Sequence, residues 1–345
     1  MAVPAWQTAS EKPGAIPPTP STITVALCTY QGAQYLPQQL HSLLAQQCLP
    51  NEIVVFDDAS KDGTWELLQA FASHAATLGV QVAIHSNPAN IGYVANFTKA
   101  LLAARGELIF LCDQDDVWHA DKISRFADEF ERRPDLLMLH SDADLVDKEG
   151  QSLNCKLFGA FEVSREELNG VHDGEAFKVL VKRNIVTGAT MAIRRSVIAN
   201  GFAVPNGWIH DEWLAMVAAT QGCVDCLETA TIDYRQHGNN QVGARPRGFI
   251  ERVTGGSVSR ADFMARMLAR TQSLMDQAAS GQLALSAPEL HLLSQRLRHA
   301  QLRANLPPTT MSRITAVLGE YQSGRYGEFG NGLRSMLSDL FKLRG

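Results

Sequence analysis

The sequence predicts an α/β fold, in which helices cover a sheet on both faces, followed by a helical C-terminal region. From Ile23 onward, short runs rich in β-branched residues alternate with stretches of helical periodicity. The predicted strands end about one βα unit apart, and strand signals disappear after Arg245. Strands joined through helices need crossover connections, so we expect these strands to be parallel.

The elements of the first half follow from this alternation. Strands are predicted at residues 23–28, 52–57, 80–85 and 107–112. Helices are predicted at residues 33–46, 64–77 and 93–104, and a further helix is expected to begin near Trp118. The carboxyl ends of parallel strands share one edge of a sheet, where open α/β sheets bind their ligands. Polar residues that follow these four strands should therefore converge on one crevice.

The pattern beyond Leu136 is less regular. We expect strands at 136–140, 187–193 and 226–234, a helix at 211–221, and an irregular segment at 145–161. After Arg245 several helices are predicted, with breaks at 255–256, 307–308 and 324–332. Residues 1–21 are rich in Pro, Ala and polar residues, so we expect a disordered tail there.

Composition narrows the classes of function. The chain has 345 residues, of which 45% are hydrophobic and 19% charged, and a formal net charge of -5. This charge argues against a nucleic-acid binder that depends on bulk basicity. The sequence shows neither a run of about 18 apolar residues nor a signal-peptide pattern, so we expect no transmembrane helix and no secretion signal.

Cysteine usage fits reduced thiols in a cytosolic protein, because several of the six cysteines lie within apolar runs. Cys223 and Cys226 have the spacing of a metal or redox pair. No second pair with knuckle-like spacing accompanies them in the sequence, so structural zinc is the less favoured alternative.

The most informative motif is a cluster of three carboxylates. Asp113, Asp115 and Asp116 follow the apolar run 108–112, with Gln114 between them. Because these carboxylates repel one another at the end of a buried strand, their placement asks for a compensating cation. Mg²⁺ or Mn²⁺ would suit, since these ions take oxygen ligands and leave room for substrate phosphates. The alternative is a solvated loop or the cap of the following helix.

Acidic and amide residues also follow two other predicted strands. Asp57 and Asp58 could accept hydrogen bonds from a base or a ribose, although a tight turn also favours Asp at these positions. Asn90 and Asn96 could contact a nucleobase edge, and Gly92 would permit close approach of the backbone. Capping of the next helix explains Asn90 almost as well.

Together these motifs resemble the family 2 glycosyltransferases, which have the GT-A fold, a Rossmann-like mixed sheet flanked by helices. The resemblance covers about residues 23–242. It rests on the motifs CTYQG at 28–32, DDAS at 57–60, NIG at 90–92 and DQDDVW at 113–118. With IHDEW at 209–213 and YRQHGNN at 234–240, these motifs are most similar to the bacterial rhamnosyltransferase-like branch. Gln31 stands where many relatives have Asn.

The resemblance implies roles for individual residues. Thr29, Asp57 and Asp58 would line the base and ribose pocket, and Asp113 would lie over the ribose. Asp116 would be a second metal ligand or a support for its loop. The implied donor-binding residues are Thr29, Tyr30, Asp57, Asp58, Asn90, Gly92, Asn96, Asp113, Gln114, Arg235 and His237. The implied metal ligands, for Mg²⁺ or Mn²⁺, are Asp115 and His237. Arg235 would act as a phosphate fork, and His237 could instead cap a loop.

Transfer with inversion also needs a general base for the acceptor hydroxyl. Asp211 matches the catalytic Asp of the family's acidic pair. Most relatives place that Asp second of two acids, whereas this chain has His210-Asp211-Glu212. The His-Asp form is usual in the rhamnosyltransferase-like branch and favours Asp211 over Glu212. Both acids would also suit a helix start without any catalytic role.

Basic residues dominate the chain after Leu290. They are Arg296, Arg298, Arg303, Arg313, Arg325, Arg334, Lys342 and Arg344. An apolar face accompanies them, formed by Leu333, Met336, Leu337, Leu340 and Phe341. Such a surface could lie on an anionic membrane, whereas core packing or a homo-oligomer contact would use the same residues.

The resemblance thus implies an inverting, metal-dependent glycosyltransferase that moves L-rhamnose from dTDP-L-rhamnose onto a bacterial surface polysaccharide or a lipid-linked glycan. Other UDP- or GDP-linked sugars are the alternative donors. The implied organisation is a tail (1–21), a GT-A domain (22–245) and a helical region (246–345). Within the domain, residues 22–116 would bind the nucleotide and residues 117–245 the acceptor. We expect a cytoplasmic protein, peripheral on the inner face of the membrane if its C-terminal helices bind lipid.

Three other classes are less consistent with the sequence. A nucleotide-dependent oxidoreductase would need a glycine fingerprint after the first strand, but residues 28–33 contain a single Gly. A nucleotidyltransferase would need a Gly-rich, basic triphosphate loop at the same place. A non-catalytic glycan-binding module would show neither nucleotide-sugar hydrolysis nor metal-dependent nucleotide affinity.

Overall fold

The computed structural model describes residues 21–198, 201–237, 260–307 and 309–341. Nearly all of the expected tail, the motif residues 238–240 and the predicted break at 255–256 lie outside these ranges. So do Lys342 and Arg344 of the basic C-terminal set.

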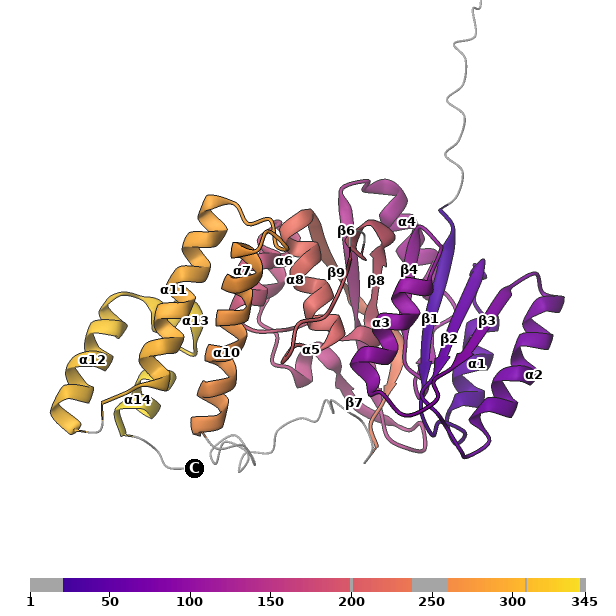
Figure 1. The fold of residues 1–345 in the computed structure, drawn as a ribbon, viewed down its shortest axis with the longest axis horizontal. Helices are drawn as coiled ribbons and strands as arrows, with labels where there is room; N and C mark the ends of the chain where they lie inside the picture. The colour runs from indigo at the N-terminus through magenta and orange to yellow at the C-terminus, as the bar shows by residue number, and fades with distance from the viewer. Residues whose placement is uncertain (1–20, 199–200, 238–259, 308, 342–345) are drawn as a thin grey trace, which may run out of the picture.

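A mixed sheet forms the centre of the molecule (Figure 1). Its strand order is β3-β2-β1-β4-β8-β6-β9-β5, with β7 paired to β6. Four strands are parallel to one another: β1 (Ile23–Thr29), β2 (Glu52–Asp57), β3 (Gln81–Ser86) and β4 (Leu108–Cys112). Their carboxyl ends therefore share one edge, as predicted, and the strand order reverses between β1 and β4.

The second half of the sheet is not uniformly parallel. The strand β8 (Met191–Arg194) runs antiparallel to β4 and to β6 (Leu136–Val146). The long strand β9 (Cys223–Arg235) is parallel to β6, and the two-residue strand β5 (Val117–Trp118) is antiparallel to β9. The expected mixed α/β sheet is thus confirmed.

Helices cover both faces of this sheet. One face is covered by α1 (Leu36–Leu44), α2 (Thr64–Thr77) and α4 (Lys122–Arg132). The other is covered by α3 (Tyr93–Ala103), α6 (Arg165–His172), α7 (Ala176–Lys182) and α8 (His210–Gln221). Burial on two faces explains why β1 and β4 are continuous apolar runs rather than alternating ones.

The C-terminal region is helical, as predicted, and lies at the end of the molecule opposite to β3 (Figure 1). Its helices are α10 (Arg260–Ala279), α11 (Ala287–Ala304), α12 (Thr310–Gln322), α13 (Arg325–Phe329) and α14 (Leu333–Phe341). A capping box between Ser286 and Glu289 starts α11, with Pro288 in its first turn. None of the helices in the described ranges has the length and apolar character needed to cross a bilayer.

Three predicted elements differ from the structure. No helix begins at Trp118, because Val117 and Trp118 pair with β9 and α4 starts only at Lys122. The segment predicted as irregular contains β7 (Ser152–Lys156) and α5 (Leu157–Ala160). The strand expected from Thr187 starts at Met191, because a 3₁₀ turn occupies 188–190.

The expected basic and apolar C-terminal face is divided by the fold. Arg296, Arg303 and Arg313 are buried and bonded to neighbouring helices or loops, so these three cations cannot face a lipid surface. Met336 packs in the interior of the helical region, while Leu337 remains exposed with two further apolar residues, Leu333 and Phe341.

Candidate active site

The carboxyl edge of the parallel strands brings together most of the predicted site residues. Thr29 ends β1, Asp57 ends β2, and the cluster from Asp113 to Asp116 follows β4. Asp211, from the first turn of α8, lies close enough to Asp113 for its charge to raise the pKa of that carboxyl. Residues separated by almost a hundred positions thus act on one another electrostatically at this edge.

Asp57 ties the end of β1 to the turn after β2. Its Oδ1 accepts hydrogen bonds from Thr29 Oγ1 at 2.8 Å and from Ser60 Oγ at 2.5 Å, and its Oδ2 accepts from Ser60 N at 2.9 Å. Thr29 and Asp57 are both buried. The turn that the residue types favour is therefore present, and it is held at the edge where a nucleotide would bind.

Asp58 holds a different turn, the one that leads into α3. Its Oδ1 accepts from Asn87 Nδ2 at 2.8 Å, and its Oδ2 accepts from Gly92 N at 2.9 Å. Gly92 has a φ of 85°, a conformation that glycine adopts without strain. The structure thus separates the two neighbouring carboxylates, which the sequence does not distinguish.

The predicted amide residues differ in exposure. Asn96 is buried and donates from Nδ2 to the carbonyl oxygen of Phe56 at 2.8 Å, so it supports the site from within. Asn90 is exposed, and its Oδ1 accepts from Gly92 N at 3.2 Å. Tyr30, with 47% of its surface exposed, also faces solvent.

Gln114 joins the acidic cluster to the loop after β1. Its Oε1 accepts from Tyr30 N at 2.8 Å, and its Nε2 donates to Tyr30 O at 3.0 Å. Gly32 leaves room for this amide, since a Cβ at that position would lie 2.2 Å from Gln114 Oε1. The site therefore depends on a paired amide that fixes two loops against each other.

The acidic cluster itself is electrostatically strained. Burial, together with the nearby charges of Asp115 and Asp211, raises the pKa of Asp113 to about 8. Burial and the charges of Asp115 and Asp113 raise the pKa of Asp116 well above its usual range. Asp116 Oδ1 accepts from Arg235 N at 3.0 Å, but its buried Oδ2 has no hydrogen-bond partner among the described residues.

Arg235 and His237, at the end of β9, complete this edge. Arg235 is buried and donates from Nε to the carbonyl oxygen of Asp115 at 2.8 Å and from Nη2 to Gln38 Oε1 at 2.6 Å. These bonds make it a support for the acidic loop. His237 Nε2 lies 2.7 Å from Asp115 Oδ2, and its ring stacks on Tyr35 with centroids 4.9 Å apart.

Asp211 and Glu212 have different surroundings. Asp211 Oδ2 accepts from Gly188 N at 2.8 Å, and burial raises the pKa of its carboxyl although backbone N–H groups act to lower it. Glu212 forms an ion pair with Arg270 of α10 at 2.5 Å. An acid committed to an arginine is less available as a base, so these contacts favour Asp211 for that role.

Lys122 is a residue of this site that the sequence analysis missed. It is fully buried, donates from Nζ to the carbonyl oxygen of Ala189 at 2.7 Å, and lies 4.2 Å from the centre of the Trp118 ring. Burial lowers the pKa of its ammonium to about 7, while the charges of Cys112, Asp116 and Asp113 act to raise it. The only sequence signal is a lysine in a helical stretch four residues after Trp118.

Comparison with known proteins identifies the family. A sequence profile described as "Glycosyl transferase family 2" matches residues 24–202, which is more than half of the chain. The chain belongs to this family. The match confirms the family that its motifs predict. This family 2 glycosyltransferase is also similar to several curated bacterial proteins.

Several of these relatives carry the name of a transferase. An uncharacterized glycosyltransferase of Nostoc sp. is 27% identical over 228 residues, covering 64% of this chain and 67% of the relative. The dTDP-rhamnosyl transferase RfbG of Shigella flexneri is 24% identical over 228 residues, covering 63% of this chain and 74% of RfbG. An uncharacterized protein of Mycobacterium tuberculosis is 28% identical over 130 residues, which is only 37% of either chain.

Solved structures confirm the GT-A fold. Residues 1–349 of TarS from S. aureus, crystallised with UDP-GlcNAc, superpose with a TM-score of 0.54 at 17% identity, covering 88% of this chain and 81% of the TarS 1–349 chain. At this level of identity the likeness concerns the fold alone.

Proposed function

We propose that the protein is an inverting glycosyltransferase that moves L-rhamnose from dTDP-L-rhamnose onto a bacterial surface polysaccharide or lipid-linked glycan, with the help of Mg²⁺ or Mn²⁺. The observation that carries the proposal is the approach of Asp211, on α8, to the acidic cluster after β4. This approach would place a general base for the acceptor hydroxyl beside the carboxylates that would serve the leaving diphosphate. The likeness to RfbG supports the donor, and the motif resemblance supports the acceptor class.

The residues at the strand edge fit a divalent cation. Burial and the charges of neighbouring acids raise the pKa values of Asp113 and Asp116, and Asp116 keeps an unpartnered oxygen among the described residues. Asp115 and His237 would hold the ion, which would act as a Lewis acid on the departing diphosphate. Arg235 and Gln114 fix the loop that carries these ligands.

The acceptor would be served from α8. Asp211 would take the proton from an acceptor hydroxyl that attacks the anomeric carbon opposite to the leaving group. Its carboxylate is oriented by the N–H groups of Gly188 and Glu212. Because burial raises its pKa, the carboxylate is a stronger base than a solvated aspartate. In this scheme residues 22–116 bind the donor and residues 117–245 the acceptor.

The donor is tested by thermal-shift measurements with dTDP, UDP and GDP ligands, each with and without Mn²⁺. A ligand that binds only the folded state raises the melting temperature. We expect the largest rise with dTDP-L-rhamnose and Mn²⁺. A larger rise with UDP or GDP sugars would overturn the donor, and the lack of any metal-dependent rise would overturn the metal-dependent transferase.

The acidic cluster is tested by Asp115→Asn. This variant should lose the metal-dependent part of the thermal shift and nearly all sugar transfer, because its carboxylate would hold the ion. Asp128→Asn is the matched control, since Asp128 is exposed on α4. Equal behaviour of the two variants would contradict the role of Asp115.

A further inference from the structure

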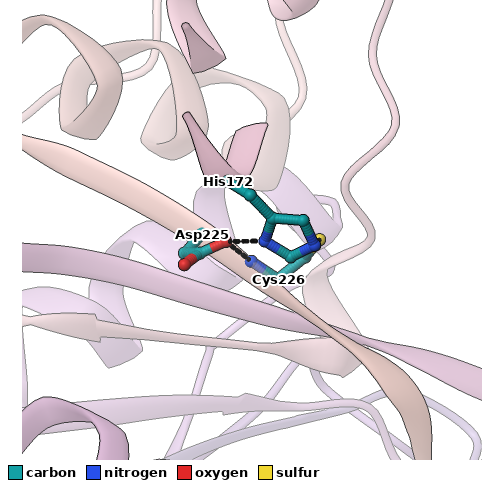
Figure 2. Close-up of side chains that lie close together, drawn as sticks. All are labelled: His172, Asp225 and Cys226. Atoms are coloured by element: carbon teal, nitrogen blue, oxygen red, sulfur yellow. Dashed lines mark hydrogen bonds and ion pairs between the residues drawn. The ribbon is translucent and has the colours of Figure 1, made fainter. Parts of the chain in front are cut away.

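In the proposed function the donor edge is formed by the carboxyl ends of β1, β2 and β4, with Asp57, Asp113 and Asp115. A second group of potential metal ligands lies away from this donor edge. His172 is the last residue of α6, and Asp225, Cys226 and Glu228 lie on β9, towards the end opposite to Arg235. One ligand atom each from His172, Asp225 and Cys226 lies within 4.8 Å of the other two (Figure 2).

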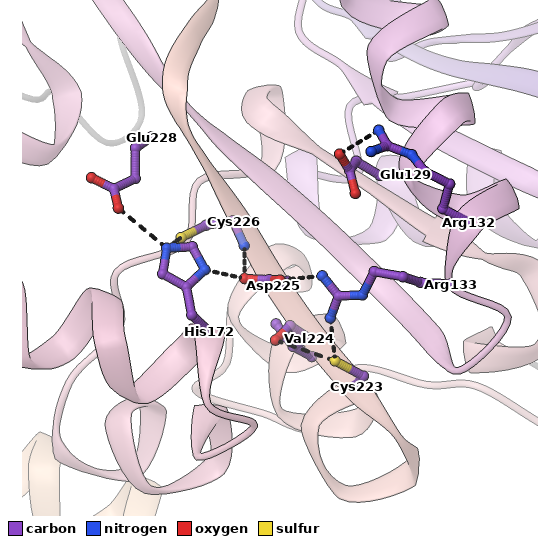
Figure 3. Close-up of polar contacts among 9 residues, drawn as sticks. All are labelled: Glu129, Arg132, Arg133, His172, Cys223, Val224, Asp225, Cys226 and Glu228. Atoms are coloured by element: carbon purple, nitrogen blue, oxygen red, sulfur yellow. Dashed lines mark hydrogen bonds and ion pairs between the residues drawn. The ribbon is translucent and has the colours of Figure 1, made fainter.

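The pair of cysteines that the sequence singles out is divided by the sheet. Cys223 packs against the core on the α4 side, and its Sγ accepts from Arg133 Nη2 at 3.0 Å (Figure 3). Cys226 belongs to the core on the opposite side. The two thiols therefore do not form the chelating pair that their spacing suggests, and only Cys226 faces His172.

Asp225 contacts one of the two ring nitrogens of His172. Its Oδ1 lies 2.6 Å from His172 Nδ1, and its carboxylate also forms an ion pair with Arg133 (Figure 3). Arg133 supplies a counter-charge for Asp225, and in the tautomer that donates to this carboxylate Nδ1 carries the proton. This leaves the lone pair on Nε2, which lies 3.3 Å from Glu228 Oε1 and 4.0 Å from Cys226 Sγ. A carboxylate behind a histidine in this way is typical of zinc-binding histidines.

We propose that His172 Nε2, Cys226 Sγ and Glu228 Oε1 bind a zinc ion, and that Asp225 orients the histidine from the other side. In a tetrahedral site with bonds of about 2.0–2.3 Å, N and O ligands lie about 3.3 Å apart and N and S ligands about 3.6 Å. The observed distances from Nε2, 3.3 Å to Glu228 Oε1 and 4.0 Å to Cys226 Sγ, are close to these values. The partly exposed side chain of Glu228 would have to move towards Cys226 to complete the site. One nitrogen, one sulfur and one oxygen ligand also suit Zn²⁺ better than Mg²⁺ or Ca²⁺.

The same residues are ordered like a nucleophilic Cys-His-Asp triad, but the surroundings of the thiol oppose that role. Cys226 is buried, and burial together with the charges of Asp225 and Glu228 raises the pKa of its thiol to about 12. A reactive cysteine needs an electropositive, accessible environment. A bound cation would supply the positive charge that this position lacks.

A buried histidine beside the cluster is an independent observation. His140 on β6 is in register with Cys226 on β9, and register partners in neighbouring strands point to the same face. Its side chain is fully buried, and neither ring nitrogen has a hydrogen-bond partner in the described part of the chain. An imidazole on this face would supply the fourth donor that a closed zinc site needs.

Arg165 competes with the proposed ion for one ligand. It donates to both oxygens of Glu228, at 2.6 and 2.8 Å, from a largely exposed position on α6. Its positive charge beside the site opposes a cation, so Arg165→Gln should raise the affinity for zinc several-fold. A bound ion would connect α6 to β9. This part of β9 has no pairing with β5, which pairs only with residues 232 and 233.

Titration of the chelator-treated full chain with Co²⁺ and then Zn²⁺ tests the site. We expect one saturable sulfur-to-cobalt charge-transfer band, which Zn²⁺ displaces. The band should vanish in Cys226→Ser and persist in Cys223→Ser, the matched control. Should Cys226→Ser fail to fold, His172→Ala, whose side chain is partly exposed, should weaken binding at least about 100-fold.

Two results would overturn the site: no saturable cobalt band in the wild type, or the same band in Cys226→Ser. The ligands proposed at the donor edge are oxygen and nitrogen atoms, and a band from Cys112, the thiol next to that edge, would persist in Cys226→Ser. A protein that binds cobalt through Cys226 but transfers no sugar would refute the proposed function and leave this inference standing.

Discussion

Buried carboxylates occur both at the donor edge of the sheet and among the C-terminal helices, and their pKa values shift in opposite directions. At the donor edge, burial and neighbouring acids raise the pKa values of Asp113 and Asp116. In the helices, burial acts in the same direction on Asp339 and Glu320, but ion pairs outweigh it and lower both pKa values.

The difference lies in the cations that the chain provides. Asp339 is bonded to Arg303 at 2.7 Å, to Arg260 and to the Tyr326 hydroxyl, which connect α14 to three other helices. The acidic cluster after β4 has Lys122 near it, but this lysine bonds to a backbone carbonyl, so the carboxylates stay under-compensated. The helices pair their buried acids with arginines, whereas in the proposed function a ligand compensates the acids at the donor edge, as is often the case at functional sites.

The largest expected effect is at the donor edge. Asp211→Asn should lower kcat for sugar transfer about 10²–10⁴-fold, because a general base contributes that much. The free energy of unfolding should stay within about 1 kcal/mol of the wild type, since the removed charge was disfavoured by burial. In the wild type, transfer should fall as the pH drops below the raised pKa of Asp211. Steady-state kinetics and urea unfolding measure both quantities.

Glu212→Gln serves as the comparison. Its carboxylate pairs with Arg270, so we expect its substitution to affect stability more than the chemical step. A loss of kcat in Glu212→Gln that exceeds the loss in Asp211→Asn would transfer the role of base to Glu212.

The next effect concerns the helical region. Asp339→Asn should lower the free energy of unfolding of this region by about 3–5 kcal/mol, because it leaves buried Arg303 without its counter-charge. Urea unfolding followed by circular dichroism measures it, with Glu328→Gln as a control at an exposed position of α13. Similar midpoints for the two variants would show that Asp339 does not connect these helices.

A smaller effect should appear when the pH is lowered. Burial lowers the pKa of His299 to about 4, below its usual value of about 6.5, even though Glu320 acts to raise it. The unfolded chain therefore takes up a proton first, and stability should decrease by about 1 kcal/mol per pH unit from about pH 6.5 towards 4. His299→Gln should flatten this dependence, whereas His291→Gln, exposed on the same helix, should not. Equal slopes in all three proteins would contradict the assignment to His299.

The parallel half of the fold was predictable because its signals are local. Each of β1, β2 and β4 is a short apolar run followed by polar turn residues, and burial on both faces makes the run continuous. The convergence of Thr29, Asp57 and the acidic cluster then follows from strand direction alone. The position of Asp211 beside them rested on the family resemblance rather than on any local signal.

Other features depend on residues far apart in the chain. Val117 and Trp118 form a strand only because β9 passes beside them. Lys122 is buried because Trp118 and the carbonyl of Ala189 surround it, which no local pattern indicates. The cluster at Cys226 needs α6, a helix that was not predicted although Ser164 and Glu167 form a capping box at its start.

The smallest effect concerns the loop after β1, which the side-chain amide of Gln114 holds at Tyr30. Gly32→Ala would place a Cβ 2.2 Å from Gln114 Oε1, so the paired amide bonds between Gln114 and Tyr30 would have to open. Because a flexible side chain can move aside, the cost should be about 1 kcal/mol, seen as a several-fold rise in KM for the donor. Gly159→Ala is the control, since a Cβ there meets no atom within 4 Å. An unchanged KM in Gly32→Ala, with normal folding, would mean that the Gln114 pairing does not shape the donor site. In that case only the charges of the acidic cluster, and not the geometry of its loop, would distinguish this edge from the C-terminal helices.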